Sequence, residues 1–387
     1  MDFLVVGCGL SGCVVARNLA ERGYKVTIWE RRDHIAGNMY DYVDSYGVLV
    51  HKYGPHTFHT KKKELYDYIC RFASWVDYKL TCMTEIDGIA TPTPFNFQTI
   101  DDFYAPKQAI ELKAHIKAAF GDRQTATVVE VIQHDDPLIR AYGQFLFDKD
   151  YSLYTAKQWG VSPNEIDVSI LQRVPLRFSY DTGYFDDEYQ VIPRPSYTDF
   201  FKNLINHPNI TVKFNIDALT RLSVKDSKLF LDDRICPCTV VYTGALDELF
   251  GCIEGSLPYR SLHFEWVHED IESKQKAPVV AYPQAAGYTR ITEYKKLPVQ
   301  NVKGTTYAVE YPLTYCDNSK SEPYYPVLTE ESKRKYDRYK ELADKVENLY
   351  YCGRLADFKY YNMDQALERA LELCKIVMVK QFCNTTV

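Results

Sequence analysis

The sequence that decides the fold is DFLVVGCGLSG, residues 2–12, in which a short apolar run leads directly into three glycines. The apolar run predicts a buried strand and the glycines a tight turn, and Ala16, Leu19 and Gly23, at helical spacing, predict the helix that follows. A second apolar run, YKVTIW at residues 24–29, ends at Glu30. A strand, a glycine turn, a helix and a second strand that ends in an acidic residue together predict a dinucleotide-binding βαβ unit.

Each conspicuous residue of this unit has a physical role in holding a dinucleotide. Gly7 permits the tight turn, Gly9 lets the backbone approach a pyrophosphate, and Gly12 lets the helix pack close to the strand. The free N–H groups at the helix N-terminus suit phosphate oxygens. Glu30 is placed to accept hydrogen bonds from a ribose hydroxyl pair. An ordinary glycine turn in a βαβ unit is the competing interpretation.

Length and charge restrict the class of protein. A chain of 387 residues can form two or three domains with a sizeable core. The net charge of −6 and the pI of about 5.9 argue against nucleic acid as the main partner. No apolar run reaches the roughly 18 residues that span a bilayer, and the first strand begins at residue 2. We therefore expect a cytoplasmic protein with no membrane insertion and no signal peptide.

The 11 cysteines are scattered along the chain. The only close pairs are Cys8 with Cys13 and Cys236 with Cys238. A zinc site would need two such pairs at a suitable separation. We therefore expect reduced, structural cysteines and no metal site.

Strands of the nucleotide-binding type return late in the chain, at residues 209–215, 239–244 and 348–353. Residues 99–160 have a helical pattern, with helix starts at Pro106 and Pro137, and residues 258–315 are strand-like. The class is therefore α/β, with a discontinuous Rossmann-like domain that two insertions interrupt. We expect the Rossmann-like domain at 1–76, 208–250 and 340–387, a helical insertion at 97–170, and an antiparallel sheet domain that carries substrate at 77–96, 171–207 and 251–339.

Shorter motifs lie between these elements in a characteristic order. They are ERRDHIAGN (30–38), YGPHTFHT (53–60), YTAKQWG (154–160), RVPLRF (173–178), YTGALD (242–247), EYP (310–312), GRL (353–355) and YYNMDQA (360–366). Over essentially the whole chain, this set resembles the short bacterial type of UDP-galactopyranose mutase. YTAKQWG and the YYNMD segment are the specific motifs, because many flavoproteins share the N-terminal fingerprint.

The resemblance implies an isomerase that interconverts UDP-galactopyranose and UDP-galactofuranose. Such enzymes use FAD in its reduced form, although the overall reaction is not a redox reaction. In the family mechanism, N5 of the reduced flavin attacks the anomeric carbon, UDP departs, the sugar ring contracts, and UDP returns. The partners implied are therefore UDP-galactose in both ring forms, an external reductant for the flavin, and a second copy of the chain in a homodimer.

The resemblance also implies which residues act on the substrate. Guanidinium groups match the oxygens of a departing diphosphate, and the family motifs assign this role to Arg173 and Arg290. His56 would approach the flavin N5, whereas His59 would be structural. The other substrate-binding residues implied are Tyr154 and Trp159 at the uridine and sugar, and Tyr184, Tyr311, Tyr360 and Asn362 at the diphosphate end.

The same comparison implies the residues that hold FAD. They are Gly7, Gly9, Ser11, Gly12, Glu30, Arg31, Gly37, Asn38, Thr243, Gly244, Arg354, Asn362, Met363 and Asp364. Met363 and Asp364 precede the final helix, whose N-terminal dipole would stabilise the anionic reduced flavin.

The chain departs from the family pattern at three places. Ala36 replaces a glycine, which is awkward only if its φ is positive. Residues 146–153 differ from the family, and Asn362 stands where relatives can carry Asp. Three other functions stay open: an FAD-dependent oxidoreductase of the amine-oxidase type, a mutase of altered specificity for a UDP-N-acetylgalactosamine-type substrate, and a non-catalytic flavin-binding protein. His56 favours the plain galactose substrate over the N-acetylated one.

Overall fold

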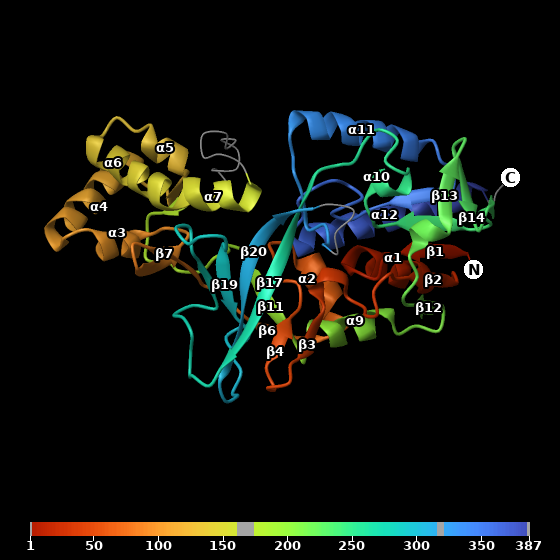
Figure 1. The fold of residues 1–387 in the computed structure, drawn as a ribbon, viewed down its shortest axis with the longest axis horizontal. Helices are drawn as coiled ribbons and strands as arrows, with labels where there is room; N and C mark the ends of the chain where they lie inside the picture. Colours follow the sequence, from red (N-terminus) through yellow and green to blue (C-terminus); the bar gives the residue numbers. More distant parts are fainter. Residues whose placement is uncertain (1, 161–173, 316–320, 385–387) are drawn as a thin grey trace.

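A five-stranded parallel sheet forms the centre of the dinucleotide-binding unit. The computed structural model describes residues 2–160, 174–315 and 321–384 (Figure 1). Every neighbouring pair in the sheet is parallel, and the strand order is β12 (Ile210–Lys213), β2 (Val26–Trp29), β1 (Phe3–Val6), β16 (Thr239–Tyr242) and β22 (Leu349–Tyr351). The strands come from the beginning, middle and end of the chain, so the predicted discontinuous Rossmann-like fold is confirmed.

Helices cover both faces of this sheet, because its apolar strands are buried on both sides. One face packs against α1 (Leu10–Ala20), α9 (Tyr197–Ile205) and α12 (Met363–Asn384), whose apolar side chains share one core with β1 and β2. The other face packs against α10 (Leu246–Leu249) and α11 (Glu330–Asp344). In Figure 1 this unit occupies the right half of the molecule, together with both chain termini.

A seven-stranded sheet stands beside the dinucleotide-binding unit, in the middle of Figure 1. It is antiparallel except where β18 pairs with β7 in parallel. Residues 82–93 form a hairpin that turns at Asp87 and Gly88 and lies at one edge of the sheet. The strand order is β21 (Tyr325–Pro326), β17 (Tyr259–Glu269), β20 (Thr305–Thr314), β19 (Arg290–Glu293), β18 (Val279–Ala281), β7 (Cys82–Ile86) and β8 (Ile89–Thr93).

The helical insertion forms a separate group with its own core. Its predicted helix starts are confirmed: Pro106 opens α4, and Asp136 caps α6 by accepting the N–H groups of Leu138 and Ile139. The members are α3 (Phe97–Phe103), α4 (Pro106–Phe120), α5 (Val128–Ile132), α6 (Pro137–Leu146), the π-helical η2 (Phe147–Tyr151) and α7 (Ser152–Trp159).

Smaller sheets complete the described chain. No helix in the described residues is long and apolar enough to cross a membrane. The remaining strands are β3 (Asp41–Val43) with β4 (Leu49–His51); β5 (Phe58–Thr60), β11 (Tyr189–Arg194) and β6 (Ser74–Asp77); β13 (Leu222–Lys225), β14 (Lys228–Leu231) and β15 (Arg234–Ile235); and β9 (Thr125–Ala126) with β10 (Leu176–Arg177).

Two helices lie differently from the expected domain division. The boundary expected between residues 339 and 340 falls inside α11. This helix has a highly polar sequence, in which Tyr339 and Ala343 are the buried contacts with the nucleotide-binding core, so its apolar periodicity is weak. Helix α9, expected in the sheet domain, packs on α1. We therefore propose that both helices belong to the dinucleotide-binding unit.

Candidate active site

The glycine turn after β1 leaves the N-terminus of α1 open to a ligand. Gly9 precedes the helix with φ −84° and ψ −171°, and no side chain among the described residues caps the first turn. A Cβ atom at Gly12 would lie 2.0 Å from the carbonyl oxygen of Gly7, whereas at Gly9 the nearest atom would be the Gly37 Cα at 3.7 Å. The helix therefore offers free N–H groups and a partial positive charge to an anion.

Glu30 lies directly beneath this turn and is buried. Its Oε2 accepts the backbone N–H of Cys8 at 2.7 Å, and its Oε1 accepts that of Arg32 at 3.0 Å. A carboxylate has about four acceptor positions, so capacity remains for ribose hydroxyls. Glu30 thus braces the turn as well as presenting an acid to the predicted ribose.

One cavity extends from the glycine turn to the first residue of α12. Asp364, in the first turn of α12, is not part of the described lining, so it departs from the predicted set. Met363 is the first residue of the helix and lines the cavity, although both residues were expected to precede the helix. The predicted cofactor residues that line it are Gly7, Gly9, Ser11, Gly12, Glu30, Arg31, Gly37, Asn38, Thr243, Gly244, Arg354, Asn362 and Met363.

The cavity also contains a carboxylate that the sequence did not indicate. Glu322 forms ion pairs with Arg31 and with Arg32, the latter at 3.0 Å. Burial alone would raise the pKa of Glu322, but the two guanidinium groups hold that pKa below its ordinary value. No local pattern could identify this contact, because Glu322 lies 291 positions from Arg31 in the chain.

Ala36 has the positive φ that the sequence left undecided. It adopts φ +73° immediately before η1 (Gly37–Met39) and is fully buried. The left-handed conformation costs an L-residue roughly 1 kcal/mol. The turn beside Gly37 and Asn38 therefore keeps the geometry of a glycine turn in spite of its alanine.

Two histidines hold the loop that follows β4, of which His51 is buried and His56 is half-buried. The backbone N–H of His56 donates to Nδ1 of His51 at 3.0 Å, and Nδ1 of His56 lies 2.8 Å from the carbonyl oxygen of Gly54. A carbonyl only accepts, so Nδ1 of His56 carries the proton and Nε2 is an acceptor. Burial lowers the pKa of each histidine to about 3, so both are neutral near pH 7.

His56 and His59 have different surroundings. His56 lines the cavity. His59 instead bonds Asp187 at 2.8 Å and stacks on Phe185 at 3.6 Å, as a structural histidine does.

Arg290 is held in place by a buried carboxylate across the sheet. Arg290 on β19 and Glu310 on β20 are register partners, and both Nε and Nη2 of the guanidinium contact Oε2, at 2.9 and 2.8 Å. Glu310 is 2% exposed. Burial opposes the charge of Arg290, but Glu310 outweighs this effect and raises the pKa of the guanidinium further. Arg290 is therefore a fixed cation whose remaining N–H groups can bind an anion.

Arg290 also faces the loop that carries His56. A Cβ atom at Gly54 would lie 3.9 Å from Nη2 of Arg290 and 3.6 Å from the ring of Phe264. The fixed cation thus lies beside the loop whose His56 lines the dinucleotide cavity, and its charge helps to lower the pKa of His56.

One predicted tyrosine lies on the wrong face of the sheet. The hydroxyl of Tyr311 donates to Glu265 at 2.9 Å, and successive residues of a strand point to opposite faces. Tyr311 therefore points away from its neighbour Glu310, so its assignment to the diphosphate is wrong. Tyr325 on β21, which the sequence did not single out, stacks instead on the predicted Tyr360 at 5.2 Å.

The remaining predicted substrate residues are placed as follows. Tyr154 lies on α7, and the charge of Arg290 acts against the rise that burial causes in its pKa. Tyr184 precedes β11 and packs on Phe185 with ring centroids 4.9 Å apart. Trp159 is the last residue of α7, and Arg173 lies outside the described residues.

An ion pair between the buried Asp357 and the half-buried Arg369 fixes the turn after β22. Oδ2 of Asp357 accepts the N–H of Gly353 at 3.0 Å, while Oδ1 lies 3.2 Å from Nη2 of Arg369. The next residue, Arg354, donates to the carbonyl oxygen of Tyr361 at 2.7 Å. Its guanidinium lies 5.3 Å from the centroids of both stacked tyrosine rings, 325 and 360. Asp357 and Arg369 therefore fix a turn that lines the cofactor cavity.

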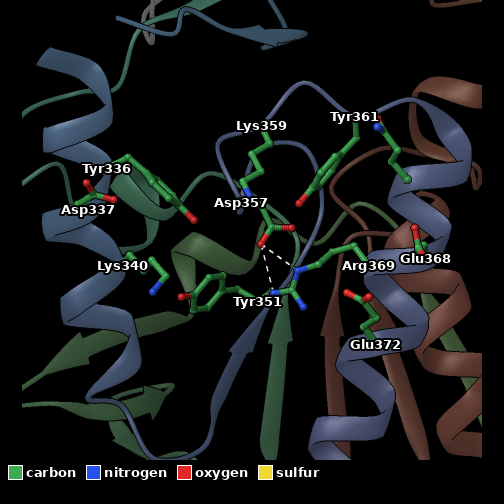
Figure 2. Close-up of a pocket in the computed structure, with 11 residues that line it drawn as sticks. Tyr336, Asp337, Lys340, Tyr351, Asp357, Lys359, Tyr361, Glu368, Arg369 and Glu372 are labelled. Atoms are coloured by element: carbon green, nitrogen blue, oxygen red, sulfur yellow. Dashed lines mark hydrogen bonds and ion pairs between the residues drawn. The ribbon is translucent and has the colours of Figure 1, made fainter. Parts of the chain in front are cut away.

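A second hollow lies behind this turn, between α11, β22 and α12 (Figure 2). Asp357 and Arg369 lie at its base, and Tyr361 extends toward them. It is a mixed-charge surface with lysines and carboxylates on its rim, and none of the predicted site residues lines its described part. It therefore supports the cofactor turn from outside rather than forming the active site.

Two family models match the chain. The model described as UDP-galactopyranose mutase matches residues 149–360, and that described as an NAD(P)-binding Rossmann-like domain matches residues 5–72.

Full-length relatives give the same pattern. The chain is 32% identical over 376 residues to a protein named dTDP-fucopyranose mutase from Escherichia coli, covering 96% of this chain and 97% of that protein. It is 35% identical over 374 residues to one named UDP-galactopyranose mutase from Mycoplasma genitalium, covering 95% and 92%. A crystal structure of reduced UDP-galactopyranose mutase superimposes with a TM-score of 0.68 over 97% of this chain and 95% of that one, at 13% identity, and so matches the fold.

Proposed function

The chain belongs to the UDP-galactopyranose mutase family, and from this premise we propose that it is a flavin-dependent isomerase that interconverts UDP-galactopyranose and UDP-galactofuranose. The observation that carries the proposal is the position of Arg290. Its charge is fixed by Glu310, and it lies beside the loop that carries His56, which lines the dinucleotide cavity.

The described residues fit FAD at the adenosine and diphosphate end. The uncapped N-terminus of α1 supports a diphosphate there, and Gly9 has no side chain that would occupy the space above it. Glu30 retains acceptor positions for the ribose. Reduced FAD would supply a nucleophilic nitrogen for the anomeric carbon, and the protein would supply orientation and charge.

Arg290 would stabilise the diphosphate as it leaves the sugar and returns. Charge grows on the leaving diphosphate, and a cation that is already fixed need not reorganise to meet it. Glu310 holds the guanidinium fork from one side, which leaves N–H groups on the other. Arg173 would add a second guanidinium, and Tyr325 and Tyr360 would add hydroxyl donors.

His56 would present a hydrogen-bond acceptor to the cofactor. Its Nδ1–H is engaged by Gly54, so the neutral ring has its lone pair on Nε2. A reduced flavin carries an N–H at position 5, whereas the oxidised form carries only an acceptor there. His56 would therefore favour the reduced state, in which the family is active.

We propose further that Tyr154 and Trp159 hold the uridine and sugar, that Asn362 lies at the diphosphate end, and that the protein is a cytoplasmic homodimer served by an external reductant. Light scattering of the purified protein measures the oligomeric state directly.

The test of function is the conversion of UDP-galactofuranose, followed by chromatographic separation of the two UDP-sugars, with and without dithionite. We expect UDP-galactopyranose to form only when the flavin is reduced, with no net consumption of electrons. Bound FAD with no conversion of any nucleotide sugar under reduction would contradict the proposal.

One relative supports a second candidate substrate. The protein named dTDP-fucopyranose mutase matches this chain over 96% of its length, as the UDP-galactopyranose mutases do. The same assay with dTDP-fucofuranose distinguishes the candidates, because a higher kcat/KM for that compound would assign a thymidine nucleotide and a 6-deoxy sugar.

A further inference from the structure

Lys157 lies in the YTAKQWG motif, on the same helix as Tyr154, and is not among the described residues that line the cofactor cavity. Its ammonium group donates three hydrogen bonds, to the backbone carbonyl oxygens of Tyr282 at 2.8 Å, Ala285 at 2.6 Å and Tyr288 at 2.8 Å. An ammonium group has three donors, so all of them are used.

The three carbonyl groups belong to one loop, residues 282–288, which joins β18 to β19. The N–H of Tyr282 donates to the carbonyl of Thr289 at 2.8 Å and closes the hairpin, and the N–H of Thr289 donates to the carbonyl of Glu310 at 2.9 Å. Arg290 is the next residue. The loop that Lys157 holds therefore ends at the ion pair that we propose for the diphosphate.

Three carbonyl dipoles that converge on one point repel one another unless a donor lies between them. Lys157 is half-buried, burial lowers its pKa, and no carboxylate among the described residues lies within ion-pair distance of it. For a fully exposed lysine, hydrogen bonds to these three carbonyl groups would add nothing to stability. Among the described residues the charge is matched by the loop carbonyls, so the ammonium and the loop conformation depend on each other.

We propose that Lys157 is a positioning residue that joins the two halves of the nucleotide-sugar site. It fixes α7, which carries Tyr154, against the hairpin that carries Arg290. In Figure 1, α7 lies on the side of the helical group that faces β19 and β20, where this contact forms. The inference rests on the proposed function, because it assigns to Lys157 the spacing between the uridine contact and the diphosphate contact.

The experiment compares Lys157→Met with Lys149→Met. Lys149 is a matched control, because it also joins the helical insertion to the sheet, through an exposed ion pair with Asp87 at 2.9 Å. The dissociation constant of UDP is measured by calorimetry, KM and kcat by the chromatographic assay, and folding by circular dichroism.

We expect Lys157→Met to raise the UDP dissociation constant and KM at least tenfold with kcat within threefold of wild type, because spacing and not chemistry is lost. Lys149→Met should leave all three within twofold. A folded Lys157→Met protein with wild-type UDP affinity would overturn the inference. If this variant does not fold, Lys157→Gln replaces it; one amide can donate to only part of the carbonyl set, so unchanged affinity there would overturn the inference equally.

Hydrogen exchange of residues 282–289 without ligand separates this inference from the function. We expect faster exchange in Lys157→Met than in wild type, and equal exchange would contradict the contact. Wild-type protein that binds no UDP would overturn the proposed function instead, whatever the exchange result.

Discussion

Gly9→Ala and Gly12→Ala form the sharpest test of where the cofactor binds. The two glycines belong to one motif, but the structure assigns them different reasons to lack a side chain. At Gly12 a Cβ atom would collide with the carbonyl oxygen of Gly7 at 2.0 Å, while at Gly9 the nearest protein atom would be 3.7 Å away. At Gly12 a side chain is therefore excluded by the protein itself, whereas at Gly9 it is excluded by the ligand that lies above the turn.

The expected magnitudes differ in the same way. The added Cβ atom at Gly12 and the carbonyl oxygen of Gly7 are both held by the backbone, so neither can move aside easily. This overpacking should lower the free energy of unfolding of Gly12→Ala by about 3 kcal/mol. At Gly9, with φ −84°, alanine gains about 0.4–1 kcal/mol through the unfolded state and loses a similar amount as a poorer N-cap, so the apoprotein should be nearly unchanged. Loss of one hydrogen bond to a charged phosphate costs about 1.5–3 kcal/mol, which weakens FAD binding by roughly 10- to 150-fold.

Urea unfolding of each apoprotein and titration with FAD, followed by flavin fluorescence, measure the two quantities separately. FAD affinity equal to wild type in Gly9→Ala would refute the placement of the diphosphate over this turn. Apoprotein stability as low in Gly9→Ala as in Gly12→Ala would refute the steric reasoning.

Three further predictions concern residues that act on the site. Asp357→Ala should raise the FAD dissociation constant about tenfold, because the Gly353 N–H loses its acceptor. Asp357→Asn should raise it less, because an amide oxygen still accepts that N–H, and equal effects of the two variants would contradict this role. His51 is neutral in the folded protein, with a pKa of about 3, so below its unfolded pKa of roughly 6.5 unfolding takes up a proton. The free energy of unfolding therefore falls by about 1.4 kcal/mol for each unit by which the pH is lowered in this range. Wild type should thus lose about 2 kcal/mol more than His51→Gln between pH 6.5 and 5 in urea titrations; parallel curves would show that His51 is protonated when folded. Arg290→Met should weaken UDP binding at least 100-fold by calorimetry while FAD binding persists, and Glu310→Gln less, because it removes only the counter-charge; loss of FAD with either would place Arg290 in the cofactor site.

Local sequence patterns predicted the elements whose signals are local. The strand, glycine turn and helix at residues 2–22 needed only neighbours in the chain, and so did the proline-initiated helices α4 and α6. The return of residues 209–215, 239–244 and 348–353 as strands of the same domain was also predicted from their apolar runs, and β12, β16 and β22 lie in these ranges. The polar helix α11 was missed, because it buries too few side chains to show a periodicity.

Side-chain direction was harder to predict than position. Tyr311 was assigned to the site from its motif, yet it is adjacent to Glu310 in a strand, and one residue of displacement reverses the face. Tyr325 lies on a two-residue strand whose pairing with β17 no local pattern indicates. The motif therefore identified the strand of Glu310, whereas the tyrosine that stacks on Tyr360 lies on a different strand.

Three of the residues that the sequence did not assign act on backbone groups. Lys157 binds three carbonyls, Asp357 binds the Gly353 N–H, and His51 accepts the His56 N–H. A backbone group looks the same at every residue type, so the partner of such a side chain leaves no trace in the sequence. Sequence motifs identify the side chains that contact a ligand, because the chemistry of the ligand specifies their residue types. The side chains that position those groups can be identified only in the folded structure, where distant segments come together. We expect the spacing between cofactor, cation and nucleotide sugar to depend on these positioning side chains.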